Sequence, residues 1–214
     1  MQRRIAIAGI HTGIGKTIAS AVLAEALAAD YWKPVQAGSL DATDSMLVKS
    51  FLTDGAKRVH PEAILLKEPR SPHAAAKTDG LQINYTGFSW PATDKTLLIE
   101  TAGGVLSPMN DNKTMADFIQ HFNLPVLLVS NNYLGSINHT LLSIEVLKNR
   151  GVNILGLIMN GAANPSSEEF IEQYAGLPVV ARIPFFEKLD STRVQQHAVT
   201  IRKSLSEILN YENH

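Results

Sequence analysis

A glycine-rich segment constrains the fold of this chain more than any other feature. The segment GIHTGIGKT (residues 9–17) follows the apolar run Ile5–Ala8 and leads into residues 16–29, which are rich in Ala and Leu. Apolar side chains recur at helical spacing in residues 16–29, whereas the short apolar run is typical of a buried strand. We therefore expect the glycine-rich segment to connect the end of a buried strand to the start of a helix.

A loop in that position can bind phosphate. Glycines let successive backbone N–H groups turn toward phosphate oxygens, and the amino end of a helix adds a favourable dipole. Lys16 is expected to contact the β- and γ-phosphates, and the Thr17 hydroxyl is expected to ligate Mg²⁺. The sequence thus predicts a P-loop. The alternative is a plain strand–turn–helix junction that contains Gly-Lys-Thr without binding phosphate.

The loop is one residue longer than the common P-loop. The common form would place a glycine at position 10, which is Ile10. A deviant branch of P-loop proteins carries a second lysine early in the loop, and that lysine would fall at position 11, which is His11. The loop resembles this branch in length but lacks its signature lysine. This disfavours the alternative function, an ATPase switch of the partitioning or regulator type.

Apolar runs and helical patterns alternate along the rest of the chain, which predicts a single α/β domain over residues 1–214. Continuous apolar strands are covered on both faces, so we expect a doubly wound, mostly parallel sheet with flanking helices. Residues 55–94 carry four prolines and are expected to be loop-rich, with one short helix near 73–77. Strands are predicted at 31–37, 96–100, 125–130, 153–160 and 177–183, and helices at 44–52, 136–150, 166–175 and 192–210.

Composition excludes several function classes. Lys plus Arg is 19 and Asp plus Glu is 20, so the formal charge is −1, which disfavours non-specific nucleic-acid binding and docking on an anionic membrane. The absence of cysteine excludes a disulfide scaffold, a thiolate zinc site and a Cys nucleophile. No stretch approaches the roughly 18 apolar residues of a membrane span. We expect a cytoplasmic protein that has neither nucleic-acid nor membrane partners.

Three charged residues lie within, at the end of, or after predicted strands. Lys33 lies in an apolar context and would be costly to bury unless it met an anion, although Pro34 beside it also suits a surface lysine at a strand start. Glu100 ends the apolar run LLIE, as in a Walker B strand whose carboxylate reaches Mg²⁺ bound to phosphates. Asp44 at a helix start is either an N-cap or a second Mg²⁺ carboxylate.

Together these motifs resemble the dethiobiotin synthetase family of P-loop enzymes. The matching segments are GIHTGIGKT (9–17), KPVQAG (33–38), SPHAAA (71–76), ETAGG (100–104), LGSINHT (134–140) and the apolar strand that ends at Asn160. The resemblance implies a P-loop NTPase fold and an ATP-dependent cyclo-ligase domain. It also implies a homodimer with the active site at the subunit interface. This chain departs from the family at two positions: many members have an acidic residue where Gly13 stands, and many have Ser or Thr where Ala37 stands. The hydroxyl that is missing at Ala37 could be supplied by Ser39.

The resemblance implies a reaction in which 7,8-diaminononanoate, CO₂ and ATP give dethiobiotin, ADP and phosphate. A carbamate and a carbamic–phosphoric anhydride would be the intermediates. The implied catalytic residues are Lys16, Lys33 and Thr12, and the implied Mg²⁺ ligands are Thr17, Asp44 and Glu100. The implied nucleotide-binding residues are Gly13, Ile14, Gly15, Lys16, Thr17, Ile18, Asn160 and Pro184. The implied substrate-binding residues are Thr12, Lys33, Ala37, Gly103, Gly104, Ser136 and Asn138.

Related ligases offer a further alternative, the corrinoid amidases of the same P-loop group. Those proteins carry a second, glutamine-hydrolysing domain with a Cys nucleophile. A chain of 214 residues without cysteine cannot contain such a domain. A non-enzymatic α/β module is also disfavoured, because phosphate- and metal-competent groups follow one another in the expected order.

Overall fold

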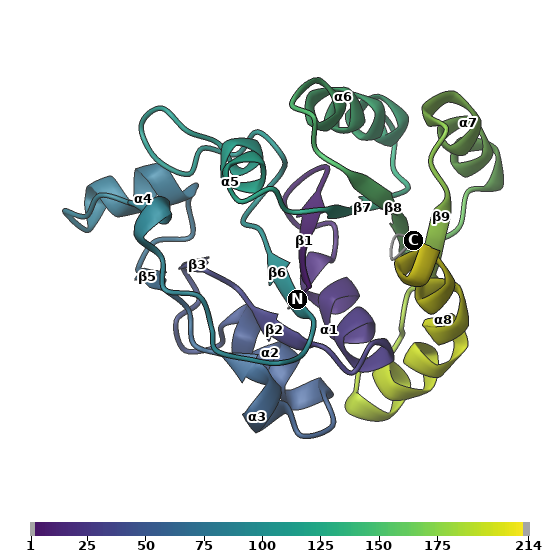
Figure 1. Cartoon of the computed structure of the whole chain (residues 1–214), viewed down its shortest axis with the longest axis horizontal. Coiled ribbons are helices and arrows are strands. Elements are labelled where there is room, and N and C mark those ends of the chain that lie inside the picture. Colours follow the sequence, from purple (N-terminus) through teal and green to yellow (C-terminus); the bar gives the residue numbers. More distant parts are fainter. Residues whose placement is uncertain (1–2, 212–214) are drawn as a thin grey trace.

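A seven-stranded parallel sheet forms the centre of the computed structural model, which describes residues 3–211 (Figure 1). Every strand pair in it is parallel, so the doubly wound α/β prediction is confirmed. A separate two-stranded sheet pairs β3 (Val35–Ala37) with β5 (Ile64–Leu66). In spatial order the large sheet consists of β4 (Val59–His60), β2 (Asp30–Trp32), β6 (Leu97–Glu100), β1 (Arg4–Gly9), β7 (Val126–Asn131), β8 (Ile154–Asn160) and β9 (Val179–Ile183).

Helices cover both faces of the large sheet (Figure 1). One face carries α1 (Lys16–Ala26), α2 (Asp44–Phe51) and α8 (Ser191–Tyr211), and the other carries α5 (Met115–His121), α6 (Ser136–Asn149) and α7 (Pro165–Ala175). The shorter helices α3 (Gly55–Arg58), α4 (Pro72–Thr78) and η1 (Tyr85–Gly87) lie in the stretch between β3 and β6. Among the helices of residues 3–211, none has the length and apolar character needed to cross a membrane.

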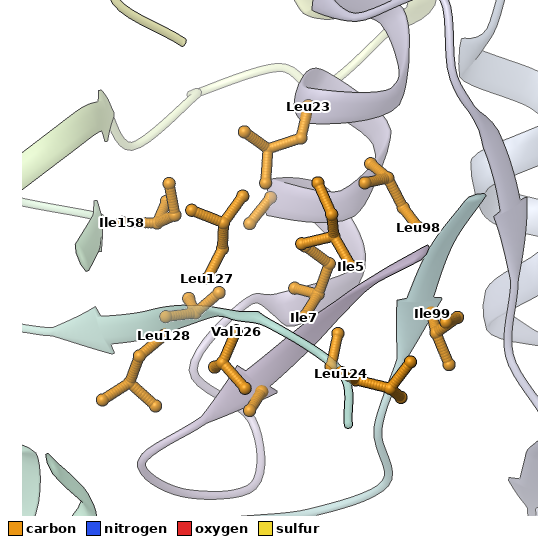
Figure 2. Packing of buried hydrophobic residues seen from close by; sticks show 14 of the residues in the cluster. Ile5, Ile7, Leu23, Leu98, Ile99, Leu124, Val126, Leu127, Leu128 and Ile158 are labelled. Carbon is orange, nitrogen blue, oxygen red and sulfur yellow. The ribbon is translucent and has the colours of Figure 1, made fainter. Parts of the chain in front are cut away.

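The core explains why the strands are continuously apolar. Ile5 and Ile7 of β1 are fully buried, and so are the neighbouring strand residues Leu98 and Leu127. Figure 2 shows Leu23 of α1 lying over these strands from one side. Because helices cover the sheet on both faces, successive strand residues are apolar instead of alternating with polar ones.

The predicted strand at 31–37 is wrong in its extent. The structure has two strands there, β2 and β3, which belong to different sheets. The break falls at Lys33 and Pro34. Proline has no backbone N–H to donate to a strand ladder, and the Lys33 side chain donates to two carboxylates instead of packing in the sheet. The break therefore moves Lys33 off any strand.

The expectation of a loop-rich stretch at 55–94 missed several elements. Strands β4 and β5 span two and three residues, which is too short for periodicity to reveal. Helix α5 also went unpredicted, although it begins with a capping box in which Thr114 accepts from Asp117 N and Asp117 accepts from Thr114 N. Elsewhere the predicted strands and helices are confirmed with ends shifted by at most three residues, the largest shift being at the end of α1.

Candidate active site

The glycine-rich segment connects β1 to α1 as predicted, and its glycines have specific roles. Gly13 and Gly15 have φ values of +76° and +86°, in the left-handed region that glycine adopts readily. At Gly15 a Cβ atom would lie 2.2 Å from Asn160 Nδ2, so a side chain there would have to displace the Asn160 amide. Asn160 Nδ2 donates to Ile14 O at 2.8 Å, which fastens the loop to the end of β8. Asn160 thus lies beside the loop although 146 positions separate it from Ile14.

The start of α1 has the features of an anion site. Gly15 is its N-cap and contributes no side-chain hydrogen bond, so the first backbone N–H groups of the helix can point at a phosphate. Lys16 is only 7% exposed, and its Nζ donates to His11 O at 3.2 Å. Burial lowers the pKa of Lys16 to about 8; the charge of Glu100 opposes that shift and the charge of Lys33 adds to it.

Three oxygen-bearing side chains meet beside Lys16. Thr17 Oγ1 lies 3.0 Å from Asp44 Oδ1 and 2.9 Å from Glu100 Oε1. These residues come from α1, α2 and β6, so the predicted Mg²⁺ ligands are brought together by the fold. Oxygen donors suit Mg²⁺, which is commonly held by one or two carboxylates together with substrate phosphates.

Asp44 is not the N-cap of its helix. Thr43 holds that position, because its side chain accepts a hydrogen bond from Met46 N at 3.2 Å. Asp44 is therefore free to direct its carboxylate toward Thr17. Within residues 3–211 no group of three or more His, Cys, Asp or Glu could hold a metal. A metal at this place would depend on Asp44, Glu100, the Thr17 hydroxyl and the nucleotide.

Lys33 is a buried cation and not a surface lysine. Its side chain is 8% exposed, and Nζ donates to Glu100 Oε1 at 3.0 Å and to Asp44 Oδ2. Burial alone would lower the pKa of Lys33. The negative charges of Glu100 and Asp44 and the hydrogen bonds to them outweigh burial and raise that pKa. Lys33 thus remains positively charged between the two carboxylates.

Two residues that the sequence analysis missed complete the arrangement. Tyr31 is fully buried, and its hydroxyl donates to Glu100 Oε2 at 2.9 Å. A signal for it existed, because Tyr31 and Lys33 stand two positions apart and so share one face of an extended chain. Ser107 Oγ accepts a hydrogen bond from Gly104 N at 2.8 Å. A Cβ at Gly103 would lie 2.2 Å from the same oxygen, so any larger residue there would have to displace Ser107.

Most of the predicted site residues line one cavity of about 610 Å³, a size typical of ligand pockets. The cavity also includes Arg70, Ser71 and Ser107, whereas Ser39 is not part of its lining. Ser71 and Ser107 thus bring hydroxyl groups to the same cavity as Ala37. The predicted residues that line the cavity are Thr12, Gly13, Gly15, Lys16, Thr17, Ile18, Lys33, Ala37, Asp44, Glu100 and Gly103.

Six predicted residues do not line this cavity: Ile14, Gly104, Asn160 and Pro184 lie near it, and Ser136 and Asn138 lie elsewhere. Ile14 is buried, and Gly104 lines an adjoining cavity of about 440 Å³ together with Thr12 and Ser107. Pro184 follows Ile183, which pairs with Asn160 in the sheet, so Pro184 lies near the glycine-rich segment. Ser136 and Asn138 are in a different place. The cavity next to Asn138 measures about 630 Å³ and is formed by the start of α6, the residues before it, and Asn164 and Ser167 at the start of α7.

The chain is similar to known proteins over most of its length. A family model described as an AAA domain, AAA_26, matches residues 3–193. The ATP-dependent dethiobiotin synthetase BioD of Christiangramia forsetii is 45% identical over 208 residues, covering 97% of this chain and 100% of that protein. BioD of Cytophaga hutchinsonii is 46% identical over 196 residues, covering 91% of this chain and 95% of that protein.

Solved structures with the same fold have more distant sequences. The cell division ATPase MinD of Pyrococcus furiosus is 17% identical, with a TM-score of 0.58 and coverage of 97% of this chain and 100% of that chain. At this identity the likeness concerns the fold alone, which is that of P-loop NTPases. The identity to the BioD proteins extends over nearly the whole of both chains. The chain therefore belongs to the family of ATP-dependent dethiobiotin synthetases.

Proposed function

We propose that this enzyme uses ATP and Mg²⁺ to join CO₂ to 7,8-diaminononanoate and close the ring of dethiobiotin, a step of biotin biosynthesis. One observation carries the proposal: two groups of side chains line the same cavity at the end of the glycine-rich loop. The first group is the cations Lys16 and Lys33, and the second is the oxygen-bearing residues Thr17, Asp44 and Glu100. Such a site combines an anion cradle, two cations and oxygen ligands for a metal, as phosphoryl transfer requires.

The proposed chemistry has three steps. One amine of the substrate attacks CO₂, forms an N–C bond and loses a proton, which leaves a carbamate. A carbamate oxygen then attacks the γ-phosphorus of ATP, and the bond from phosphorus to the ADP oxygen breaks. The second amine attacks the carbamoyl carbon, closes a cyclic urea and expels phosphate as the C–O bond breaks and the amine proton leaves.

The second step brings two anions together, and the residues of the cavity fit that need. Lys16 and the N–H groups at the start of α1 would hold the phosphates, and Lys33 would offset the charge where the carbamate approaches. Thr17, Asp44 and Glu100 would hold Mg²⁺, which supplies additional neutralisation of phosphate charge when bound. Because Asp44 and Glu100 keep Lys33 charged, that cation is present before the substrates arrive.

The carbamate would be oriented by Thr12 and by donors near Gly103 and Gly104. The N–H of Gly104 is already donated to Ser107 Oγ. The Ser107 hydroxyl keeps a proton of its own, so we include it among the proposed donors. Its place in the lining of both adjoining cavities supports this assignment.

Asn160 and Pro184 are proposed to border the adenine base. Because Asn160 Nδ2 donates to Ile14 O, the side chain presents Oδ1 as its acceptor. An acceptor matches the exocyclic amino group of adenine and not the carbonyl oxygen of guanine. This geometry supports ATP over GTP as the nucleotide.

We further propose a homodimer in which Ser136 and Asn138 of one subunit approach the substrate carboxylate bound by the other. Ser136 is buried and its hydroxyl accepts from Tyr133 N at 3.3 Å, so it would act mainly by shaping the start of α6. Asn138 is exposed beside Leu134, whose side chain is fully exposed, and Leu142 is 56% exposed. Apolar side chains of this kind support burial by a second copy.

The reaction is tested by phosphate release from MgATP in the presence of bicarbonate, with and without 7,8-diaminononanoate. We expect release to depend on the diamine and the product to have the mass of the cyclic urea. ATP hydrolysis that is indifferent to the diamine would contradict the proposed function and would favour the switch ATPase.

The shared active site is tested by mixing two inactive variants, Lys16→Ala and Asn138→Ala. A mixed dimer contains one site in which both native residues meet, so random exchange should restore about a quarter of the wild-type sites. Recovery would require the two residues to come from different subunits. If the mixture stays as inactive as the separate variants, the interface assignment is wrong.

A further inference from the structure

The segment between β5 and α4 forms one wall of the catalytic cavity and is held firmly there. Gly38, at the end of β3, has φ +74°, and a Cβ on it would lie 2.6 Å from the Cα of Pro69. Gly38 N also donates to Leu66 O at 2.8 Å. These contacts press the segment against the end of β3, and they place Arg70 and Ser71 in the lining of the cavity.

The guanidinium of Arg70 is held loosely, in contrast to the other two cations of the cavity. Lys16 donates to a backbone carbonyl and Lys33 lies between two carboxylates, and both are buried. Arg70 Nη1 lies 3.5 Å from Glu68 Oε2, and the two side chains are 59% and 42% exposed. Exposed ion pairs of this length add little stabilising free energy, so Arg70 can leave Glu68 and bind an anion in the cavity.

The neighbouring wall offers few hydrogen-bond donors to such an anion. Val35 and Ala37 are apolar, and Ala37 stands where many family members have a hydroxyl. The Gln36 amide is already engaged, because Nε2 donates to Gly38 O at 3.0 Å and Oε1 accepts from Asp44 N at 3.4 Å. An anion bound against this wall therefore needs a donor from another segment.

We infer that Arg70 contacts the substrate and holds the planar carbamate group for its attack on ATP. This inference rests on the proposed function and adds a residue to it. The guanidinium presents parallel N–H donors in a flat fork, which matches the two coplanar oxygens of a carbamate. Lys33 neutralises charge at the same group but, as a point charge, does not fix the plane. Arg70 would thus replace the hydroxyl contact that Ala37 cannot make.

The experiment compares Arg70→Ala and Arg70→Lys with Lys67→Ala. Lys67 is an exposed cation on the same segment whose backbone N–H donates to Asp79, so its side chain can be removed without loss of that bond. We expect Arg70→Ala to lower kcat/KM for the diamine about 10- to 100-fold, the effect of losing charge-assisted hydrogen bonds. Arg70→Lys should recover little of this, and Lys67→Ala should match wild type. Binding of a non-hydrolysable ATP analogue should be unchanged in all variants.

A second variant tests whether Arg70 and the missing hydroxyl serve the same contact. Ala37→Ser should raise the activity of Arg70→Ala several-fold and change the wild-type enzyme much less. The inference is wrong if Arg70→Ala has the same kcat/KM for the diamine as Lys67→Ala. It is also wrong if Arg70→Ala lowers the affinity for the ATP analogue as much as it lowers kcat/KM for the diamine. If the wild-type enzyme forms no cyclic urea, the proposed function itself is wrong. If the wild-type enzyme is active and the Arg70 variants are equally active, only the role of Arg70 is wrong.

Discussion

The hydroxyl of Tyr31 donates to Glu100 Oε2 at 2.9 Å inside the sheet, where both side chains are buried. This bond occupies one carboxylate oxygen and leaves Oε1 facing Thr17 and Lys33. Burial, followed by the charge of Glu100, raises the pKa of Tyr31 well above its usual value, so the phenol stays protonated and remains a donor. Tyr31 therefore fixes the orientation of a proposed Mg²⁺ ligand without reaching the cavity itself.

Tyr31→Phe is expected to weaken the response to Mg²⁺. Loss of a hydrogen bond behind a metal ligand typically costs about tenfold or more in metal affinity or activity, so the Mg²⁺ concentration for half-maximal rate should rise by about that factor. Calorimetric titration of the ATP analogue at several Mg²⁺ concentrations should show the same shift. Tyr174→Phe, at a side chain that is 66% exposed, is the control. An unchanged Mg²⁺ dependence in Tyr31→Phe would refute this role.

Lys33→Ala is expected to abolish turnover and to leave nucleotide binding largely intact. The ammonium that offsets charge between carbamate and γ-phosphate would be missing, at a cost of about 100-fold or more in kcat. Lys16→Ala should lose both turnover and affinity for the ATP analogue, because Lys16 belongs to the phosphate loop. Circular dichroism should show native helix content for both variants. Near-wild-type turnover of Lys33→Ala would contradict its proposed catalytic role.

Gly15→Ala is expected to disrupt the nucleotide loop. The new methyl would have to displace the Asn160 amide, and a left-handed φ costs an alanine about 1 kcal/mol in addition. Gly80→Ala separates the two effects, because Gly80 has φ +67° but a methyl group there would meet no atom within 4 Å. Both variants should lose some thermal stability, and only Gly15→Ala should lose affinity for the ATP analogue. Equal affinity in the two variants would argue against the Asn160 contact.

Glu168→Gln is expected to lower stability in a pH-dependent way. Glu168 is buried and accepts hydrogen bonds from Asn164 N, Asn132 Nδ2 and Arg182 Nε. Burial by itself would raise the pKa of Glu168, but these bonds and the Arg182 charge hold it below the usual 4.5. The carboxylate therefore stabilises the fold above pH 4.5, and this contribution is lost as the pH falls through the lower folded-state pKa.

Urea unfolding at a series of pH values checks this expectation. At pH 7 the free energy of unfolding of Glu168→Gln should be about 2 kcal/mol below that of wild type, the usual effect of removing hydrogen bonds to a charged group. The difference should narrow as the pH falls below 4.5. Glu169→Gln, at the exposed neighbour, should show no such difference. A gap that stays constant down to about pH 3 would show that ionisation of Glu168 is not responsible.

Local sequence patterns predicted the parts of the fold that depend on neighbouring residues. Apolar runs flanked by helical patterns led to the parallel α/β sheet, and the glycine-rich segment led to the loop between β1 and α1. Both rest on interactions within a few residues, namely strand burial and the backbone freedom of Gly13 and Gly15. The glycine-rich segment and the apolar run LLIE pointed to Lys16 and Glu100, and the resemblance to dethiobiotin synthetases implied a catalytic role for Lys33.

What the sequence by itself determined was the class of fold, the phosphate loop and the residue types of the site. Only the tertiary structure decided that Lys33 leaves the sheet, that Tyr31 supports Glu100, and that Arg70 reaches the same cavity. The physical reason is that these relationships join segments 67 or more positions apart, as for Tyr31 and Lys33 with Glu100, or depend on contacts such as that of Gly38 with Pro69. Periodicity in the sequence indicates which face of a helix or strand is buried. Which distant residues a side chain contacts is determined by the packing between elements.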